Sequence, residues 1–250
     1  MIMKHILYLA KEPGKGVRDD LSRLSGKEVT VVDCLGAYGD YYRKMGYNVI
    51  TKTKYFELDG TMRFDVVIGN PPYGSGANLA VKFVNKAAEL SDDIRMVLPL
   101  SFKKVSIQNK VSLDISVVEE RDLPENTFPN GIRAVYQRWA KTGVVREKVV
   151  TYTKHPDFNF IDDKHTADFM IGRTGGGPAG RIKTENFSHY SDEHYFMKAT
   201  PEVLNNFLSI ADQLRALASK GNGRKTLSKH DIVTCYMKNF GGGYEQEQTQ

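Results

Sequence analysis

The stretch that most constrains the fold is residues 65–73, where a run of β-branched residues ends in Asn-Pro-Pro-Tyr. The apolar run predicts a buried parallel strand. The two prolines cannot continue that strand, because they lack an N–H and hold φ at about −65°. A residue that precedes a proline is also pushed towards an extended conformation. We therefore expect a stiff corner at the carboxyl end of a strand, where open α/β sheets place their ligands.

The corner presents Asn70, Pro71, Pro72 and Tyr73. An exocyclic amino group on a base or an amide is a poor nucleophile, because its lone pair is delocalised. Hydrogen bonds from its two hydrogens to the Asn70 side-chain oxygen and the Pro71 carbonyl would favour a pyramidal, more nucleophilic nitrogen. Tyr73 would stack on the planar group and hold it in line with a methyl donor. Such catalysis works by orientation and electrostatics, and it needs no histidine or cysteine nucleophile.

Asn70-Pro71-Pro72-Tyr73 after a hydrophobic strand resembles the catalytic motif of the S-adenosylmethionine-dependent amino-methyltransferases. Within that group the sequence is most similar to the adenine-N6 DNA methyltransferases of restriction–modification type. A surface Asn-Pro turn is the alternative interpretation. The resemblance implies S-adenosylmethionine as cofactor and double-stranded DNA as substrate, with the target base flipped out of the duplex. A restriction endonuclease is a candidate partner.

The implied fold class is α/β, a Rossmann-like class I methyltransferase fold with a mostly parallel sheet, helices on both faces and a terminal antiparallel hairpin. We assign residues 1–145 to the catalytic core and residues 146–250 to a C-terminal extension that contacts DNA and recognises the target. The extension has the character of a small appendage packed on the core. Near the N-terminus, residues 2–9 are consistent with a short strand and residues 17–24 with a short helix.

Residues 29–33 form the first clear strand of the sequence, and a glycine-containing turn and an amphipathic helix follow it. The family has an acidic residue and two glycines here as its cofactor motif. This chain offers Asp33, Gly36, Ala37 and Gly39, so alanine stands at the first glycine position, and Gly36 replaces it only if the turn is shifted by one. An ordinary strand–turn–helix without a ligand is the alternative.

Two acidic residues are further candidates for contacts to the donor. In the family, an acid that ends the second strand binds the ribose hydroxyls; Lys52 and Lys54 occupy that stretch here, and Glu57 is the nearest candidate. Another acid, shortly before the catalytic strand, contacts the adenine ring of the cofactor. Asp59 holds that place, although an Asp before Gly is also common in turns. Asn70 completes the cofactor contacts that the resemblance implies.

Phe128-Pro129, followed by residues 134–139, resembles the terminal hairpin of the family's core. There the Phe packs on the opposite face of the extruded adenine from the Tyr. Phe128 is therefore our second candidate for stacking on the base, with a plain core phenylalanine as the alternative. The elements predicted around it are a helix at residues 77–90 and strands at residues 95–100 and 117–123.

The extension contains a glycine-rich run at residues 172–181, with Arg173, Arg181 and Lys183 in it or just after it. Repeated glycines let a backbone lie against a duplex, and arginines contact phosphates or guanine edges. We expect this run to contact DNA; a surface loop or a part of the cofactor site are the alternatives. One helix is predicted from residue 201 to about residue 218, and another at residues 229–237 with Ser228 as its N-cap.

Composition indicates which class of molecule the protein binds and in which cellular compartment it works. The formal charge of +5 favours a polyanionic partner. Two cysteines are too few for a disulfide framework or a zinc site, and the histidines lack ligand spacing, so we expect no metal and a reducing, cytoplasmic setting. No apolar run approaches a membrane span. Methylation of RNA, methylation of a glutamine amide in a protein, and a catalytically inactive nucleic-acid-binding relative remain as alternative functions.

Overall fold

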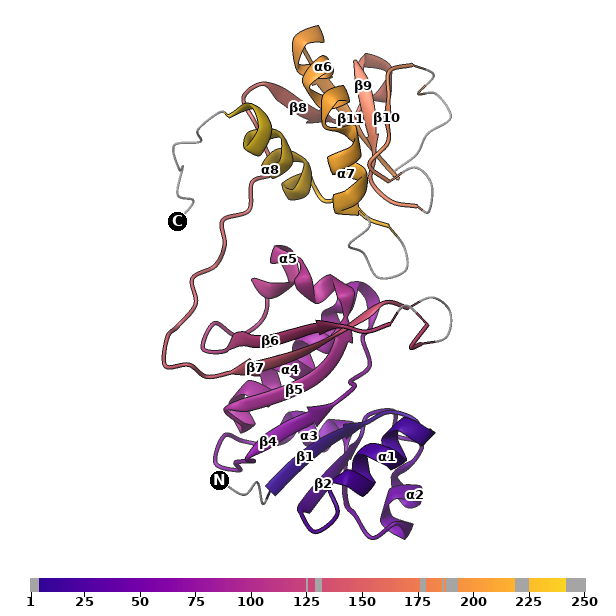
Figure 1. The fold of residues 1–250 in the computed structure, drawn as a ribbon, viewed down its shortest axis with the longest axis vertical. Coiled ribbons are helices and arrows are strands. Elements are labelled where there is room, and N and C mark those ends of the chain that lie inside the picture. The colour runs from indigo at the N-terminus through magenta and orange to yellow at the C-terminus, as the bar shows by residue number, and fades with distance from the viewer. Residues whose placement is uncertain are drawn as a thin grey trace. The chain divides into compact units, whose positions relative to one another are not determined.

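The computed structural model describes residues 5–124, 126–128, 132–175, 179–185, 187, 193–218 and 225–241. The chain divides into two compact units, Met1–Val149 and Val150–Gln250. Each unit has a β-sheet and a hydrophobic core of its own (Figure 1).

Among the described residues, the first unit contains a seven-stranded sheet in the order β3-β2-β1-β4-β5-β7-β6. Its strands are β1 (His5–Ala10), β2 (Glu28–Asp33), β3 (Asn48–Thr51), β4 (Val66–Gly69), β5 (Asp93–Pro99), β6 (Ser116–Asp122) and β7 (Ala134–Ala140). Its helices are α1 (Lys15–Arg23), α2 (Gly39–Lys44), α3 (Lys52–Glu57), α4 (Asn78–Leu90) and α5 (Val105–Gln108). Strands β1 to β5 are parallel, and β7 is antiparallel to both of its neighbours. The predicted fold class is confirmed.

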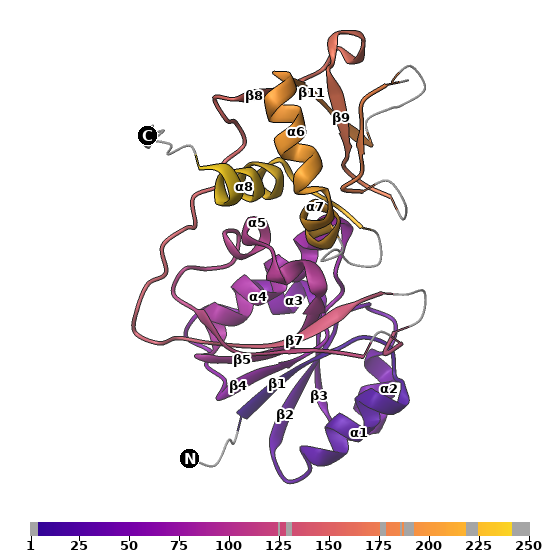
Figure 2. The same cartoon turned by 45° about the horizontal axis from the view of Figure 1, so that its top comes forward.

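Helices cover both faces of this sheet, with α3 and α4 on one side and α1 and α2 on the other (Figure 2). The central strand β1 shows why: Leu7 and Leu9 belong to the core under α4, whereas Ile6 and Tyr8 belong to the core under α1 and α2. Successive side chains of a strand point to opposite faces, so a strand covered on both sides is almost continuously apolar.

The strand at residues 29–33, the first clear strand of the sequence, is the second strand of the fold. The short strand expected at residues 2–9 is β1, which begins at His5 among the described residues and pairs with both β2 and β4. It therefore occupies the centre of the parallel sheet. Because β2 lies one strand further out, the glycine turn after Asp33 does not adjoin the strand that leads to Asn70.

The second unit contains, in its described part, a four-stranded antiparallel sheet in the order β10-β9-β11-β8. The strands are β8 (Phe158–Ile161), β9 (Phe169–Gly172), β10 (Ile182–Lys183) and β11 (His194–Ala199). The helices are α6 (Pro201–Ser209), α7 (Ala211–Ala218) and α8 (Lys229–Phe240). Phe158, Phe207 and Tyr236 form an aromatic centre, with ring centroids 5.0 to 5.2 Å apart. This region builds a hydrophobic core of its own.

The single helix expected from residue 201 to about residue 218 is broken. α6 ends at Ser209, and the Ile210 N–H bonds to the carbonyl of Phe207 three residues back before α7 begins. Thr200 is the N-cap of α6 and accepts a hydrogen bond from the Val203 N–H. The predicted N-cap of α8 is confirmed, because Ser228 forms a capping box with Asp231. α8 continues to Phe240, three residues further than expected.

Each unit holds one of the two cysteines in its interior. Cys34 follows β2 and Cys235 lies on α8, and both are buried free thiols. Burial raises the pKa of Cys34 to about 12 and also raises that of Cys235. No helix in the described part of the chain combines the length and the apolarity that crossing a membrane requires.

We expect Gly69→Ala to destabilise the protein by about 3 kcal/mol, since it combines a strained φ with a backbone clash. Gly69 has φ +152°, and an added Cβ would lie 2.4 Å from the Leu9 carbonyl oxygen. Urea unfolding monitored by circular dichroism measures the change. Gly60→Ala is the matched control, because its Cβ would have no neighbour closer than 3.8 Å. Equal stability of the two variants would contradict the close β1–β4 approach.

Candidate active site

The polar corner after β4 lies where the strand order of the sheet reverses. From β1 the chain proceeds outwards to β2 and β3, then crosses to β4 on the other side of β1. In open α/β sheets this switch point leaves a crevice at the carboxyl ends of the strands, and ligands bind there. The Asn70 N–H donates to the Leu9 carbonyl at 3.3 Å, so the corner begins where β1 and β4 separate. We call this place the β1–β4 crevice.

Asn70 brings an unused acceptor into the crevice. Its Oδ1 is buried and has no hydrogen-bond partner among the described residues; the same is true of the Tyr73 hydroxyl. A buried polar atom without a partner costs about 1–3 kcal/mol. Native proteins satisfy nearly all such atoms, and an exception calls for a specific cause. The crevice thus offers an acceptor suited to an N–H donor of a ligand.

Backbone contacts on the other side of the corner hold Tyr73 in place. Its main-chain carbonyl accepts the Ala80 N–H at 3.1 Å, which ties the corner to the first turn of α4. Gly74 has φ +70°, and an added Cβ would lie 2.7 Å from the Leu79 Cβ. Tyr73 packs against the core under α4, and burial raises the pKa of its phenol. The phenol therefore stays protonated at neutral pH.

Residues 11–14, between β1 and α1, and the first turn of α1 form the opposite side of the crevice. The Lys11 Nζ lies over the Tyr73 ring, 5.5 Å from its centroid. An added Cβ on Gly14 or Gly16 would have no heavy atom within 4 Å, so this loop borders open space. Sequence reasoning gave the loop no role. The signal that could have drawn attention to it is the pair of glycines around Lys15, in a turn that directly follows a strand.

Asp33 ends β2 and holds the turn that follows it. Its carboxylate accepts the N–H groups of Leu35 at 3.3 Å, Gly36 at 2.9 Å and Tyr38 at 2.8 Å. The residue is 3% exposed. Gly36 has φ +74° and open space around it, whereas Gly39 begins α2 and an added Cβ there would meet only the flexible Arg43 side chain.

Asp33 is the last residue of β2, whereas Glu57 is the last residue of α3. An ionised carboxylate has about four acceptor sites, of which the turn uses three, so one remains for a hydroxyl. Gly36 and Ala37 are exposed beside it. The turn after β2 therefore has one carboxylate acceptor site and two exposed backbone positions left for other contacts.

Glu57 lies on the exposed side of α3. Its carboxylate is 3.9 Å from the Lys54 ammonium, and both side chains are more than half exposed. This surface ion pair gives Glu57 a partner on its own helix and shows no contact with Asn70 or Asp33.

Asp59 lies at the edge of the sheet opposite to Asn70, in the connection that leads from α3 to β4. An added Cβ on the neighbouring Gly60 would lie 3.8 Å from the Glu89 carbonyl, and the Phe64 N–H bonds to the Leu90 carbonyl. Both carbonyls belong to the end of α4, just before β5 begins. The Asp59 carboxylate accepts hydrogen bonds from the backbone N–H and the hydroxyl of Thr61, and these bonds lower its pKa.

Phe128 lies at the same edge of the sheet as Asn70. It belongs to the connection between β6 and β7, and β7 begins at Ala134 opposite Pro99, the last residue of β5. Phe128 is half-buried, and the described ring contacts do not include one between it and Tyr73. Pro129 lies outside the described residues.

Arg173, Arg181 and Lys183 lie together on the second unit. The Gly172 N–H bonds to the Arg181 carbonyl, which places Arg173 and Arg181 at the same end of β9 and β10. Arg181 and Lys183 are two residues apart on an extended edge strand, so their side chains share a face. They line a groove of about 470 Å³ whose residues are Arg181, Ile182, Lys183, Leu208, Ala211 and Arg215.

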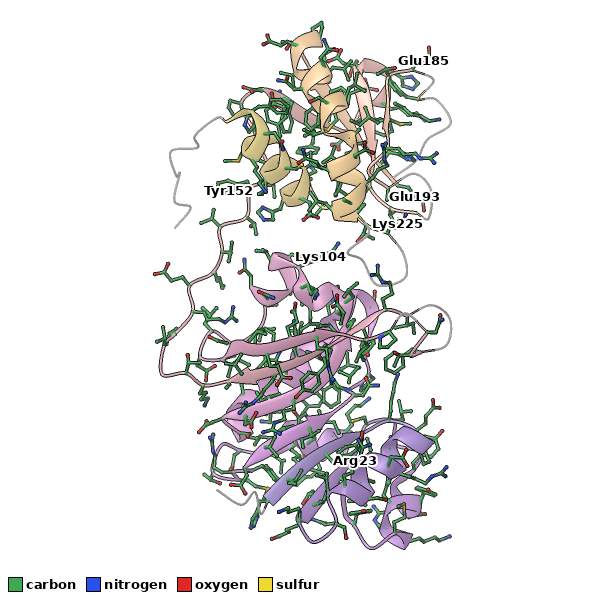
Figure 3. All side chains as sticks on the ribbon, viewed as in Figure 1. Arg23, Lys104, Tyr152, Glu185, Glu193 and Lys225 are labelled. Atoms are coloured by element: carbon green, nitrogen blue, oxygen red, sulfur yellow. The ribbon has the colours of Figure 1, made fainter. Side chains whose placement is uncertain are left out.

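Part of the glycine-rich run is packed against other segments of the second unit. Two carbonyls hold its first part: Glu193 accepts the Arg173 N–H and Lys225 accepts the Gly175 N–H (both acceptor residues are labelled in Figure 3). Gly180 has φ +79°, and an added Cβ would lie 2.8 Å from the Arg215 backbone of α7. Residues 176–178 of the run lie outside the described residues.

Comparison with known proteins finds a family model that matches part of the chain. Residues 22–108 match the family model of the Eco57I restriction-modification methylases. The matched segment runs from α1 to α5 and includes the whole corner at Asn70. The predicted resemblance is confirmed, and S-adenosylmethionine is the methyl donor that this family implies. No curated protein matches the chain.

Solved structures of methyltransferases match part of the chain at low identity and low TM-score. PH1948, an RNA methyltransferase candidate of Pyrococcus horikoshii, is 22% identical with a TM-score of 0.42, over 56% of this chain and 76% of that one. TrmN of Thermus thermophilus is 15% identical with a TM-score of 0.41, over 56% and 44%. M.EcoKI, the M protein of the type I restriction enzyme EcoKI, is 13% identical with a TM-score of 0.40, over 55% and 40%.

We expect Asp33→Asn to lower the free energy of unfolding by about 2 kcal/mol, because the new amide group turns a donor towards buried N–H groups. Chemical denaturation followed by circular dichroism measures it. Asp40→Asn is the control, since that side chain is 90% exposed and pairs with Arg43 on the surface; its change should stay below about 0.5 kcal/mol. An unchanged stability of Asp33→Asn would show that the turn does not depend on this carboxylate.

Proposed function

We propose that this chain transfers a methyl group from S-adenosylmethionine to the exocyclic N6 amino group of adenine in double-stranded DNA, after the base has flipped out of the duplex. The observation that carries the proposal is the buried Oδ1 of Asn70, which has no partner among the described residues. It lies at the carboxyl end of β4, beside the switch point of a methyltransferase sheet.

Asn70 Oδ1 and the Pro71 carbonyl accept the two N6 hydrogens and draw the nitrogen lone pair out of conjugation. The donor supplies a methyl group activated by a sulfonium. N6 bonds to the methyl carbon as the carbon–sulfur bond breaks with its electron pair left on sulfur, and the surplus proton leaves N6 for water. Pro71 and Pro72 keep the acceptors fixed, so little reorganisation accompanies the reaction.

Tyr73 and Phe128 stack on the two faces of the extruded adenine. Extrusion costs a few kcal/mol of unstacking, and stacking on an aromatic side chain returns about 1–3 kcal/mol per base. Tyr73 already has a fixed backbone and a packed position, so its ring loses little entropy when the base arrives. The Asp33 carboxylate holds a ribose hydroxyl of the donor, next to Gly36 and Ala37.

DNA is the substrate that the family match implies, and Arg173, Arg181 and Lys183 supply phosphate contacts. The groove beside β10 combines three cationic residues with three apolar ones. Charge of this kind attracts any duplex, so these contacts position the DNA and base contacts give the sequence preference.

The first experiment is methyl transfer from tritiated S-adenosylmethionine to unmethylated duplex DNA, with nucleoside analysis of the product. We expect label in N6-methyladenine. Asn70→Ala should lower the rate at least about a hundredfold, as loss of one positioned hydrogen-bonding group does in other enzymes. Its affinity for DNA should stay within about threefold of the native value.

Label in another nucleoside would overturn the assignment to adenine. Transfer to RNA or to a glutamine-containing peptide, with none to DNA, would replace the substrate class. Equal loss of transfer and of DNA affinity in Asn70→Ala would overturn the division of roles between the corner and the basic residues.

For the double variant Arg181→Ala and Lys183→Ala we expect weaker binding to all duplexes alike. The slope of log K against log salt should become shallower by about 2, at about 0.9 per lost phosphate contact. Fluorescence anisotropy over a salt series measures this slope. Lys198→Ala is the control, because Lys198 pairs with Asp168 at 2.8 Å. An unchanged slope in the double variant would remove the groove beside β10 from the DNA interface.

A further inference from the structure

Lys11 is the charged side chain of the β1–β4 crevice that the proposed function leaves without a role. It directly follows β1, and its ammonium lies over the ring of Tyr73. The residue is half-buried. In the part of the chain that the structure describes, no carboxylate lies within ion-pair distance of it.

Asp33 and Glu12, two acids close to Lys11 along the sheet edge or in the sequence, form no ion pair with it in the described part of the chain. Asp33 directs its carboxylate to three backbone N–H groups of its own turn. Glu12, the neighbour of Lys11 in sequence, is exposed. Lys52, at the end of β3, adds a second positive charge: both Lys11 and Lys52 act electrostatically on the Cys34 thiol between them and oppose the rise of its pKa. Two ammonium groups, those of Lys11 and Lys52, thus lie near the carboxylate of Asp33 at the carboxyl edge of β1 to β3.

A half-buried ammonium whose contact is an aromatic ring has capacity left for an anion. An ammonium carries three N–H donors, and a ring face provides none of the lone pairs that these donors need. Charge-assisted hydrogen bonds to an ionised oxygen group are among the strongest that a side chain makes. The flexible stem of lysine also lets the ammonium leave the ring for such a group.

We propose that Lys11 is an anion-binding residue of the β1–β4 crevice, which takes an ionised oxygen group of a ligand: the carboxylate at the amino-acid end of the methyl donor, or a phosphate of the target nucleotide. This inference rests on the proposed function and adds to it a residue that helps to select the ligand.

Calorimetry with two adenosyl compounds tests the carboxylate. S-adenosylhomocysteine carries the amino-acid end, and 5′-methylthioadenosine lacks it. We expect Lys11→Met, which keeps the length of the apolar stem, to weaken S-adenosylhomocysteine about tenfold and to change 5′-methylthioadenosine by less than about twofold. Lys11→Arg should restore most of the difference. Lys27→Met is the matched control, because Lys27 precedes β2 at the opposite edge of the sheet.

Anisotropy with a duplex that carries an unpaired adenine tests the phosphate. If Lys11→Met leaves both adenosyl compounds unchanged and weakens this duplex about tenfold, the anion is a phosphate. The proposal fails if Lys11→Met changes none of the three affinities, or weakens both adenosyl compounds equally. If the native chain binds neither adenosyl compound, the donor assignment of the proposed function fails. In that case the affinity of Lys11→Met for the duplex is the measurement that tests the anion-binding role of Lys11.

Discussion

β1 and β4 approach each other so closely at Leu9 and Gly69 that no side chain fits between their backbones. The approach lets the Asn70 N–H reach the Leu9 carbonyl, and immediately afterwards the two prolines turn the chain away from the sheet. On the other side of the contact, the chain leaves β1 at Lys11. One backbone contact therefore places both sides of the crevice, and the two hydrophobic cores that cover β1 keep that contact fixed.

The unused acceptor of Asn70 opposes stability and favours binding. A buried oxygen without a partner destabilises the protein alone, and a ligand that donates a hydrogen to it removes that cost. Pro71 and Pro72 hold the backbone next to Asn70 rigid, so the corner cannot move to give the Asn70 oxygen a hydrogen-bond partner within the protein. The crevice is thus prepared for its ligand at the expense of the free protein, which is how preorganised sites operate.

The sequence revealed strands more readily than the places they take. Residues 29–33 and 65–69 are apolar runs of β-branched residues, and both are strands of the sheet. β1 contains Tyr8 and only one β-branched residue, Ile6, so its pattern is weaker although it occupies the centre. Linear order also does not tell which edge of a sheet a loop reaches, so the sequence did not show that Asp59 lies at the edge opposite to Asn70.

In the second unit, the short strands β8 to β10 have no long apolar run to reveal them, and the break at Ile210 occurs without proline or glycine. The corner at Asn70 was predictable because prolines limit the backbone whatever surrounds them. The Asp33 turn was less so: its three hydrogen bonds depend on the geometry of a loop, which residue types alone do not specify.

The placement of the two thiols gives each unit its own reporter. Cys34 lies in the interior of the first unit and Cys235 in that of the second, and burial keeps both protonated. A thiol reacts as the thiolate, so neither cysteine is alkylated while its unit is folded. When one unit opens and the other stays closed, a single residue becomes reactive. Peptide mapping after a brief exposure to an alkylating reagent therefore distinguishes opening of one unit from opening of the other, without any added label.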